Sequence, residues 1–165
     1  MSPNLDPFAN LFLVELECGQ RGVVAARALA AGEIIVEISG REVSTPSRYT
    51  LQVSETVHVM PPETNGTGHV QATEVWKYIN HHCAPNAFVR DRAMFALRDI
   101  APGEEINFNY NSTELDIASP FECWCDAEGR EERHLVRGFQ YLSERERAEI
   151  AHYVASHLLP RLAVV

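Results

Sequence analysis

The chain has 165 residues, 45% of them hydrophobic, which is enough to bury one core of ordinary domain size. Its net charge of −9 argues against a nucleic-acid backbone as the main ligand and suits a basic partner, although acidity also serves solubility alone. Residues 1–17 lack a basic n-region, and Glu15 and Glu17 interrupt their apolar run, so we expect no signal peptide, no membrane span and a cytoplasmic location. Four cysteines are too few for a disulfide scaffold.

Short strand-like runs separated by Gly and Pro make up most of the chain and predict a mainly β fold. Arg90, Asp91 and Arg92 separate two such runs and predict a tight hairpin turn, and residues 61–68 predict a loop. The predicted strands are residues 11–16, 22–26, 34–38, 56–60, 87–89, 93–97 and 106–109.

Two segments resemble each other, residues 27–33 (RALAAGE) and 98–104 (RDIAPGE), and each precedes an apolar run. Either one turn-and-strand unit is used twice, or the two segments share turn chemistry alone. Near the C-terminus, Ser143 and Glu146 fit a capping box, and apolar residues recur every four positions before Pro160. This last segment predicts an amphipathic helix.

Residues 77–86 (KYINHHCAPN) concentrate amides, imidazoles and a thiol. Alone, an Asn-His pair is more typical of loop hydrogen bonding than of a site. Further along, residues 103–110 (GEEINFNY) predict a turn that enters a strand ending on a phenol, and residues 123–125 (CWC) follow. The order of these three segments is the informative feature.

In this order the segments resemble the SET-domain family. Residues 80–86 match its Asn-His-x-Cys-x-Pro-Asn motif, and residues 105–110 match its Glu-Leu-x-Phe-Asp-Tyr motif, with Asn109 in place of the usual Asp. Residues 108–114 and 120–123 further resemble short stand-alone SET proteins of microbial type. The resemblance implies small curved β-sheets in which the two motif segments form a pseudoknot, followed by a C-terminal helix.

The resemblance also implies a binding site for S-adenosylmethionine. The family's Asn and His hold the adenosyl part of this cofactor, which implies these roles for Asn80 and His81. A Gly-x-Gly turn faces the methionine part, and here its second glycine is Gly22 while Gln20 occupies the first position. A side chain at Gln20 restricts the backbone freedom that glycine allows, so Arg21 and the neighbouring backbone are the expected contacts.

Tyr110 matches the family's essential tyrosine and is the predicted catalytic residue and a cofactor contact. A lysine amine has an ordinary pKa of about 10.4 and must lose a proton before it attacks a methyl group. A positive sulfonium and a dry channel favour that loss, and Tyr110 would orient the amine. The family's Tyr-x-Gly is Ile38-Ser39-Gly40 here, so one channel phenol is absent unless Tyr49 or Tyr78 replaces it.

Cys83, Cys123 and Cys125 match three ligands of the four-thiolate zinc site in the family's C-terminal extension. Position 130 is Arg, so His134 is the candidate fourth ligand of Zn²⁺. The alternative is a vestigial site of reduced thiols.

Trp124 and Phe139 would either close over the adenine or pack in the core. The resemblance divides the chain into a SET domain (residues 1–120), a post-SET-like segment (121–142) and a C-terminal helix (143–165) packed on the same domain.

The leading hypothesis is therefore an S-adenosylmethionine-dependent methyltransferase acting on a lysine of a basic protein or peptide, with neither nucleic acid nor membrane as a direct partner. One alternative is methylation of a small amine or free amino acid. The other is a binding protein that keeps the fold without catalysis.

Overall fold

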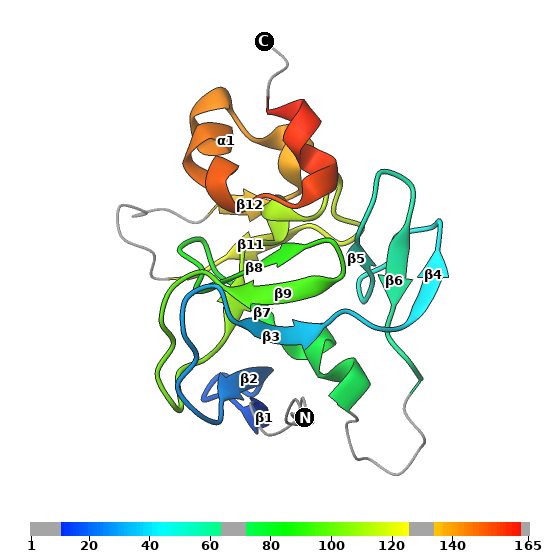
Figure 1. Ribbon diagram of the computed structural model, residues 1–165. Helices are drawn as coiled ribbons and strands as arrows, with labels where there is room; N and C mark the ends of the chain where they lie inside the picture. The colour runs from blue at the N-terminus through cyan, green and yellow to red at the C-terminus, as the bar shows by residue number, and fades with distance from the viewer. Residues whose placement is uncertain (1–10, 64–71, 126–133, 163–165) are drawn as a thin grey trace, which may run out of the picture.

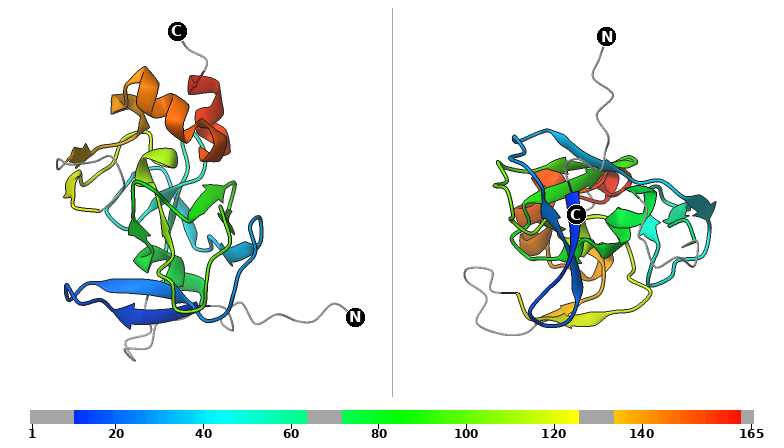
Figure 2. Two further views of the ribbon diagram at one scale, coloured as in Figure 1. Left: turned by 90° about the vertical axis from the view of Figure 1, so that its left-hand side faces the viewer. Right: turned by 90° about the horizontal axis from the view of Figure 1, so that it is seen from below.

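The computed structural model describes residues 11–63, 72–125 and 134–162. Its strands form small sheets arranged around one core, with the β1–β2 hairpin at the end opposite the C-terminal helices (Figures 1 and 2). Two antiparallel sheets have two strands each: β1 (Leu11–Glu15) with β2 (Arg21–Ala25), and β11 (Phe121–Cys123) with β12 (His134–Val136). Two antiparallel sheets have three strands each, in the order β3 (Ile34–Glu37), β9 (Ala93–Ala96), β8 (Ala87–Arg90) and in the order β4 (Arg41–Val43), β6 (His58–Met60), β5 (Leu51–Gln52). One parallel pair joins β7 (Asn80–His81) to β10 (Asn107–Phe108).

Each predicted strand is present, with its ends moved by one or two residues. The hairpin turn between β8 and β9 is confirmed, and Asp91 takes a left-handed φ of 54° that Asp tolerates better than most residues. The strands that we did not predict, such as β4 and β5, have two or three residues, which is too short for an alternating pattern to appear. The predicted loop lies mostly outside the described residues.

The two similar segments fold into the same turn. In each copy an arginine pairs with the closing glutamate, Arg27 with Glu33 and Arg98 with Glu104. The same carboxylate accepts a backbone N–H from three residues earlier at 3.0 Å in both copies, and the preceding glycine has φ of 82° or 80°. The Arg98 guanidinium lowers the pKa of Glu104 to about 2, and Arg27 likewise lowers the pKa of Glu33.

These two turns also pair with each other. Leu29 and Ile100 exchange backbone hydrogen bonds of 3.0 and 2.9 Å. Ala25 donates its N–H to the turn of the second copy, and Ala96 donates its N–H to the turn of the first. The repeat is therefore a structural unit used twice and paired across a local two-fold arrangement, which brings the residues after the second turn next to β2.

The C-terminal helix is shorter than predicted. The capping box of Ser143 and Glu146 is confirmed, but the regular helix ends at Ile150. Val154 and Ala155 are extended, and the Ala155 N–H donates to the carbonyl of Ser112 at 2.8 Å, so a tertiary hydrogen bond replaces the next helical turn. The helical elements are α1 (Glu144–Ile150) and the 3₁₀ turns η1 (Ala72–Tyr78), η2 (Tyr110–Ser112), η3 (Phe139–Tyr141), η4 (Ala151–Tyr153) and η5 (Ser156–Arg161).

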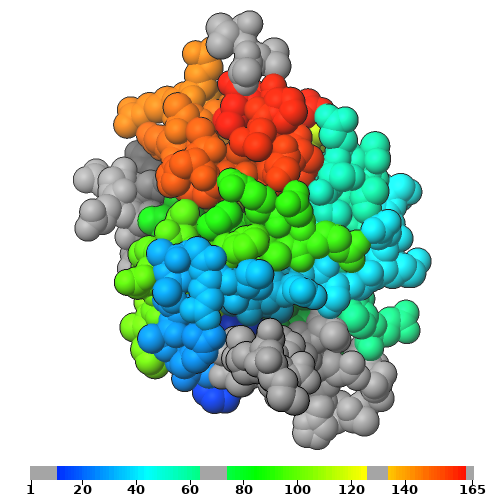
Figure 3. Space-filling model, viewed as in Figure 1, coloured from blue at the N-terminus to red at the C-terminus, as the bar shows by residue number. Residues whose placement is uncertain are grey.

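Two hydrophobic cores hold these elements together. The larger lies among the sheets and includes Val23, Ile79 and Ile106, while the smaller joins Phe139 and Val154 of the C-terminal part. In the space-filling view, the C-terminal helices (orange and red) rest directly on the β8–β9 hairpin (green) (Figure 3). Among the described residues, no helix has both the length and the apolar character needed to span a bilayer.

Candidate active site

Tyr110 directly follows β10, whose parallel partner is β7. The register places Asn107 opposite Asn80 and Phe108 opposite His81. A parallel pair requires a crossover connection, and the β8–β9 hairpin lies between these two strands in the chain. The two sequence motifs therefore lie side by side although they are far apart in the sequence.

The tyrosine is held at both its backbone and its hydroxyl. Its N–H donates to Nδ1 of His81 at 3.1 Å, and its hydroxyl donates to the carbonyl of Ile79 at 2.8 Å. Its ring contacts those of Phe108, His81 and Phe121, with centroid distances of 4.8, 5.3 and 5.8 Å. These contacts fix the direction of the phenol, which is a requirement for a group that positions a reactant.

Burial raises the pKa of Tyr110, and the nearby carboxyl groups of Glu105 and Glu114 raise it further, against a smaller opposing effect of Arg48. The phenol is therefore neutral over the physiological pH range. A neutral hydroxyl that donates a hydrogen bond to the Ile79 carbonyl keeps its lone pairs for another group. The arrangement suits hydrogen bonding and electrostatic stabilisation, and it does not suit general-base catalysis by this tyrosine.

Next to the tyrosine, Asn80 connects β7 to the edge of β2. Its Nδ2 donates to the carbonyl of Arg21 at 2.9 Å and to Oε1 of Glu105 at 3.0 Å. A Cβ on Gly22 would lie 2.9 Å from the same Glu105 oxygen, so a side chain at this position would displace the Glu105 carboxylate. The Arg21 guanidinium contacts Tyr78 through its hydroxyl, at 3.3 Å, and through its ring face. The structure thus brings together the predicted contacts Arg21, Gly22 and Asn80.

The residues that depart from the family motifs lie in different places. Gln20 is exposed in the β1–β2 connection, where its carbonyl accepts the Leu16 N–H. Ile38, which stands where the family has a channel tyrosine, is buried in the larger core. Tyr49 is 61% exposed, and Tyr78 faces Arg21. At the position of the family's channel tyrosine, this chain therefore has the aliphatic side chain of Ile38, which is part of the core.

A cluster of thiols and imidazoles lies behind His81. Cys123 and His134 are directly opposite each other across the β11–β12 pair, and Cys83 follows β7. The Cys83 sulfur lies 3.8 Å from that of Cys123, 3.1 Å from Nε2 of His134 and 3.3 Å from Nε2 of His81. The ligand atoms of these four residues lie within 4.8 Å of one another, and the Cys125 N–H donates to the Cys123 sulfur at 3.4 Å.

The cluster fits a tetrahedral zinc ion. Two thiolates at the usual Zn–S distance of about 2.3 Å lie about 3.8 Å apart, which matches the separation of Cys83 and Cys123. Burial raises the pKa of the Cys123 thiol, and a bound cation would favour the thiolate instead. The predicted ligands Cys83, Cys123 and His134 are brought together, and His81 joins them as an unpredicted neighbour. The sulfur of Cys125, the other predicted ligand, lies outside this group of four.

The two aromatic residues expected near the adenine are far from equivalent. Trp124 is 67% exposed, directly after Cys123. Phe139 is 1% exposed in the smaller core, with the Arg147 guanidinium 5.0 Å above its ring. Phe139 therefore follows the core-packing interpretation, because a contact with adenine would require this core to open.

Sequence reasoning missed Phe121, Glu105 and the buried carboxyl of Glu114. Glu105 belongs to the second motif and carried a usable signal, whereas no sequence pattern connects Phe121 to Tyr110 or Glu114 to its partners in β5 and β6.

Comparison with known proteins agrees with the geometry. The family model described as SET domain matches residues 20–111, which include Arg21 and Gly22 of β2, both motifs and Tyr110. The chain belongs to the SET-domain family.

The relatives that it resembles are much longer. "Histone-lysine N-methyltransferase 2B" of Homo sapiens is 31% identical over 121 residues, covering 65% of this chain and 4% of that protein. "Histone-lysine N-methyltransferase, H3 lysine-36 specific" of Candida albicans is 30% identical over 135 residues, covering 72% of this chain and 16% of that protein. The chain thus spans a small part of these relatives.

Among solved structures, the chain shares its fold with the "crystal structure of KRYPTONITE in complex with mCHH DNA, H3(1-15) peptide and SAH". The TM-score is 0.53 at 19% sequence identity, covering 75% of this chain and 29% of that one.

Proposed function

We propose that this chain is an S-adenosylmethionine-dependent N-methyltransferase that acts on a lysine side chain. The observation that carries the proposal is the neutral phenol of Tyr110, which His81 and Ile79 hold in a fixed direction. Next to it, Asn80 is hydrogen-bonded to the Arg21 carbonyl. Support also comes from the names of the relatives, which are histone-lysine methyltransferases, and from the structural neighbour, whose title includes SAH and a peptide.

S-adenosylmethionine supplies a methyl group on a positively charged sulfur, which an amine takes by in-line displacement. As the N–C bond forms, the C–S bond breaks, and the amine proton leaves to solvent. In this proposal Arg21, Gly22 and Asn80 hold the cofactor, while the ring nitrogens of His81 face the Tyr110 N–H and the Cys83 sulfur. The phenol oxygen of Tyr110 orients the amine through its free lone pair. Because the phenol is neutral, it does not act as the base, and the amine loses its proton without a dedicated base.

The proposed acceptor is a lysine within a basic protein or peptide. The net charge of −9 favours such a partner by electrostatic attraction. The neighbour with a peptide in its title supports an acceptor of this kind.

We further propose that Cys83, Cys123 and His134 hold a structural zinc ion, with Cys125 or His81 as the fourth ligand. The separations of the ligand atoms support the set with His81, and the N–H of Cys125 contacts the Cys123 sulfur. Bound there, the ion would tie the β11–β12 pair to β7 and so hold the extension beside Tyr110.

Incubation with radiolabelled S-adenosylmethionine and a mixture of histones tests the activity. We expect wild type to label a histone and Tyr110→Phe to lose at least about tenfold in rate, because the phenol oxygen no longer faces the amine. Tyr141→Phe is the matched control, since that tyrosine lies on η3 with the Arg137 guanidinium over its ring.

Equal labelling by wild type and Tyr110→Phe would contradict the proposal. Transfer to free lysine or small amines, with histones unlabelled, would favour the small-amine alternative. Cofactor binding without transfer would favour the binding protein. The cytoplasmic location and the three-part division of the chain stay predictions.

A further inference from the structure

Glu114 is a buried carboxyl group four residues after Tyr110. Its side chain is 12% exposed, and its backbone N–H donates to the Tyr110 carbonyl at 3.0 Å. The Thr113 hydroxyl donates to the same carbonyl at 3.2 Å. Whatever holds Glu114 in place therefore also holds the backbone of Tyr110.

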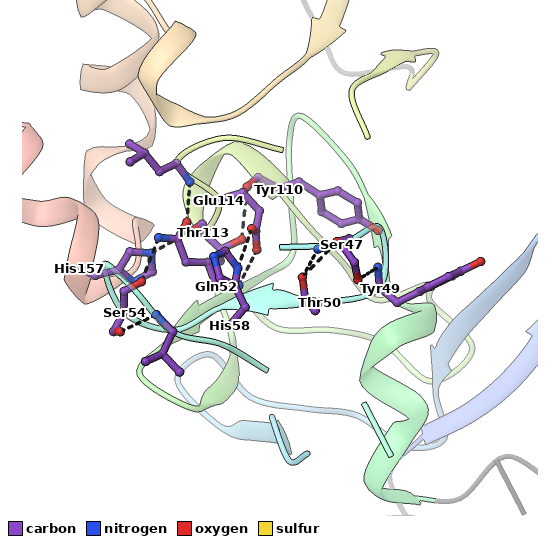
Figure 4. Close-up of polar contacts among 12 residues, drawn as sticks. Ser47, Tyr49, Thr50, Gln52, Ser54, His58, Tyr110, Thr113, Glu114 and His157 are labelled. Carbon is purple, nitrogen blue, oxygen red and sulfur yellow. Dashed lines mark hydrogen bonds and ion pairs between the residues drawn. The ribbon is translucent and has the colours of Figure 1, made fainter. Parts of the chain in front are cut away.

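The contacts of Glu114 come from the β4–β6–β5 sheet. Its Oε1 accepts the N–H of Gln52 in β5 at 2.7 Å, and the Gln52 side chain accepts the N–H of Leu115 at 2.8 Å. Its Oε2 lies 3.8 Å from Nδ1 of His58 in β6, a ring that is 8% exposed. Figure 4 shows Gln52, His58 and Glu114 gathered together, with the Tyr110 ring extending away from them.

The His58 nitrogen is the informative atom. It is buried and has no hydrogen-bond partner among the described residues, which is costly for a polar group. Burial lowers the pKa of His58, so the ring is neutral and Nδ1 is able to accept a proton donor. Burial also raises the pKa of Glu114 to about 7, which keeps a proton on this carboxyl in slightly acidic conditions. A protonated Glu114 can supply a donor to this nitrogen once the two side chains move closer than their present 3.8 Å.

Other charged groups surround the pair. His157 of η5 lies near His58 and binds the Thr113 carbonyl at 2.8 Å, and its own pKa is lowered by burial. Beyond it are Glu55 and Arg161, which act on His157 in opposite directions. On the other side, the charge of Arg48, in the segment before β5, acts on Tyr110. The β4–β6–β5 sheet and its connection thus reach both Glu114 and the phenol.

We propose that Glu114 is a positioning residue for Tyr110, which it fixes against the β4–β6–β5 sheet through Gln52 and His58. The proposal rests on the methyltransferase function above. Loss of the Glu114 proton leaves a charged carboxylate in a buried site, loosens the sheet from the tyrosine segment and lowers the rate of transfer. Within the described part of the chain, no hydrogen bond or ion pair joins Glu114 to Arg21 or Asn80, so we expect the rate to change more than the affinity for the cofactor.

The test compares kcat and the cofactor KM of wild type, Glu114→Gln and Glu114→Ala between about pH 6 and about pH 9. A Gln side chain resembles the protonated acid and keeps an acceptor for the Gln52 N–H. We therefore expect Glu114→Gln to have the same kcat as wild type near pH 6 and a kcat about threefold or more higher than wild type near pH 8.5. Ala is expected to lose about tenfold in kcat at every pH, with cofactor KM unchanged. Glu33→Gln is the matched control, because Glu33 lies in the first repeat turn and its pKa is lowered.

A wild-type to Glu114→Gln rate ratio that stays constant over this pH range overturns the proposal. A second measurement does not depend on activity. In protein labelled with ¹⁵N-tyrosine, we expect the Tyr110 amide signal, assigned with Tyr110→Phe, to move with a midpoint near pH 7 in wild type and to stay still in Glu114→Gln. If wild type transfers no methyl group, the proposed function fails, and this signal alone decides the positioning role: movement supports it, and a stationary signal overturns it.

Discussion

The backbone N–H of Tyr110 donates a 3.1 Å hydrogen bond to Nδ1 of His81, whose other ring nitrogen lies 3.3 Å from the sulfur of Cys83. One imidazole therefore connects the tyrosine of the candidate active site to the thiol cluster. Since Nδ1 accepts a hydrogen bond, the neutral ring carries its hydrogen on Nε2 or presents that nitrogen to a metal ion.

Replacement of this imidazole should misplace the tyrosine. His81→Ala removes the acceptor of the Tyr110 N–H and one wall of the aromatic cluster, so we expect kcat to fall by about tenfold or more. Steady-state kinetics with circular dichroism on the same samples checks this. His152→Ala removes an exposed histidine that contacts the Tyr153 ring edge-on and should leave kcat unchanged. Unaltered kcat in His81→Ala would show that the link has no role in catalysis.

Gly22→Ala should weaken cofactor binding with little effect on stability. The new Cβ would lie 2.9 Å from Oε1 of Glu105, which must move and then loses its hydrogen bond from Asn80. We expect affinity for S-adenosylhomocysteine to fall by about tenfold in titration calorimetry, with the free energy of unfolding changed by less than about 1 kcal/mol.

Gly32→Ala is the complementary control for this glycine. Its φ is 82°, and among the described residues no atom lies within 4 Å of the position that a Cβ would take. The change therefore costs about 1 kcal/mol of stability through the backbone and leaves affinity unchanged. The interpretation fails if the two variants lose affinity equally.

Metal content tests the thiol cluster. We expect about one zinc ion per chain in wild type and close to none in Cys83→Ser, together with a lower Tm, because the ion joins β7 to the β11–β12 pair. Elemental analysis and thermal unfolding measure the two effects. Cys18→Ser changes an exposed cysteine and should alter neither. Wild type that holds no metal after expression with added zinc would identify a vestigial site.

The fourth ligand can then be assigned. Cobalt-substituted protein should lose about one third of its thiolate charge-transfer absorption in Cys125→Ser if Cys125 binds the ion with Cys83 and Cys123, and should keep that absorption in His81→Asn. The reverse ligand set, with His81 bound, predicts unchanged thiolate absorption in Cys125→Ser and an altered ligand-field spectrum in His81→Asn.

The buried carboxyl of Glu114 makes stability depend on pH. In the unfolded chain this group releases its proton near pH 4.5, whereas in the folded protein it holds the proton until about pH 7. The folded state binds more protons in between, so the free energy of unfolding falls as pH rises through this window and levels off above it, by about 3 kcal/mol in all.

Denaturant unfolding of wild type and Glu114→Gln isolates this contribution from that of other groups. Between about pH 4.5 and about pH 7.5, the free energy of unfolding of wild type should fall relative to that of Glu114→Gln, because only wild type has the carboxyl group that titrates. Parallel pH dependences in the two proteins would show that Glu114 titrates normally in the folded state.

Much of the fold follows from local patterns. The alternating apolar runs predicted the longer strands, and Ser143 with Glu146 predicted the start of α1. The similar turn segments indicated either a repeated unit or shared turn chemistry, and the structure shows the repeated unit. Each of these patterns lies within a few neighbouring residues, where backbone geometry and short-range hydrogen bonds decide the structure. The order of the two motifs identified the family and placed Tyr110 beside Asn80 and His81.

Contacts between distant segments were decided only by the tertiary structure. Val154 leaves the helical pattern because the following residue, Ala155, bonds to Ser112, and Phe139 enters a core although its sequence position also suited a ligand contact. Glu114 looks like a surface residue in the sequence, yet β5 and β6 enclose it and change its protonation. Burial and partners across the chain set the charge of such a group, and no local pattern carries that information. The sequence by itself determined the family and the tyrosine, while the tertiary structure decided which groups hold that tyrosine in place.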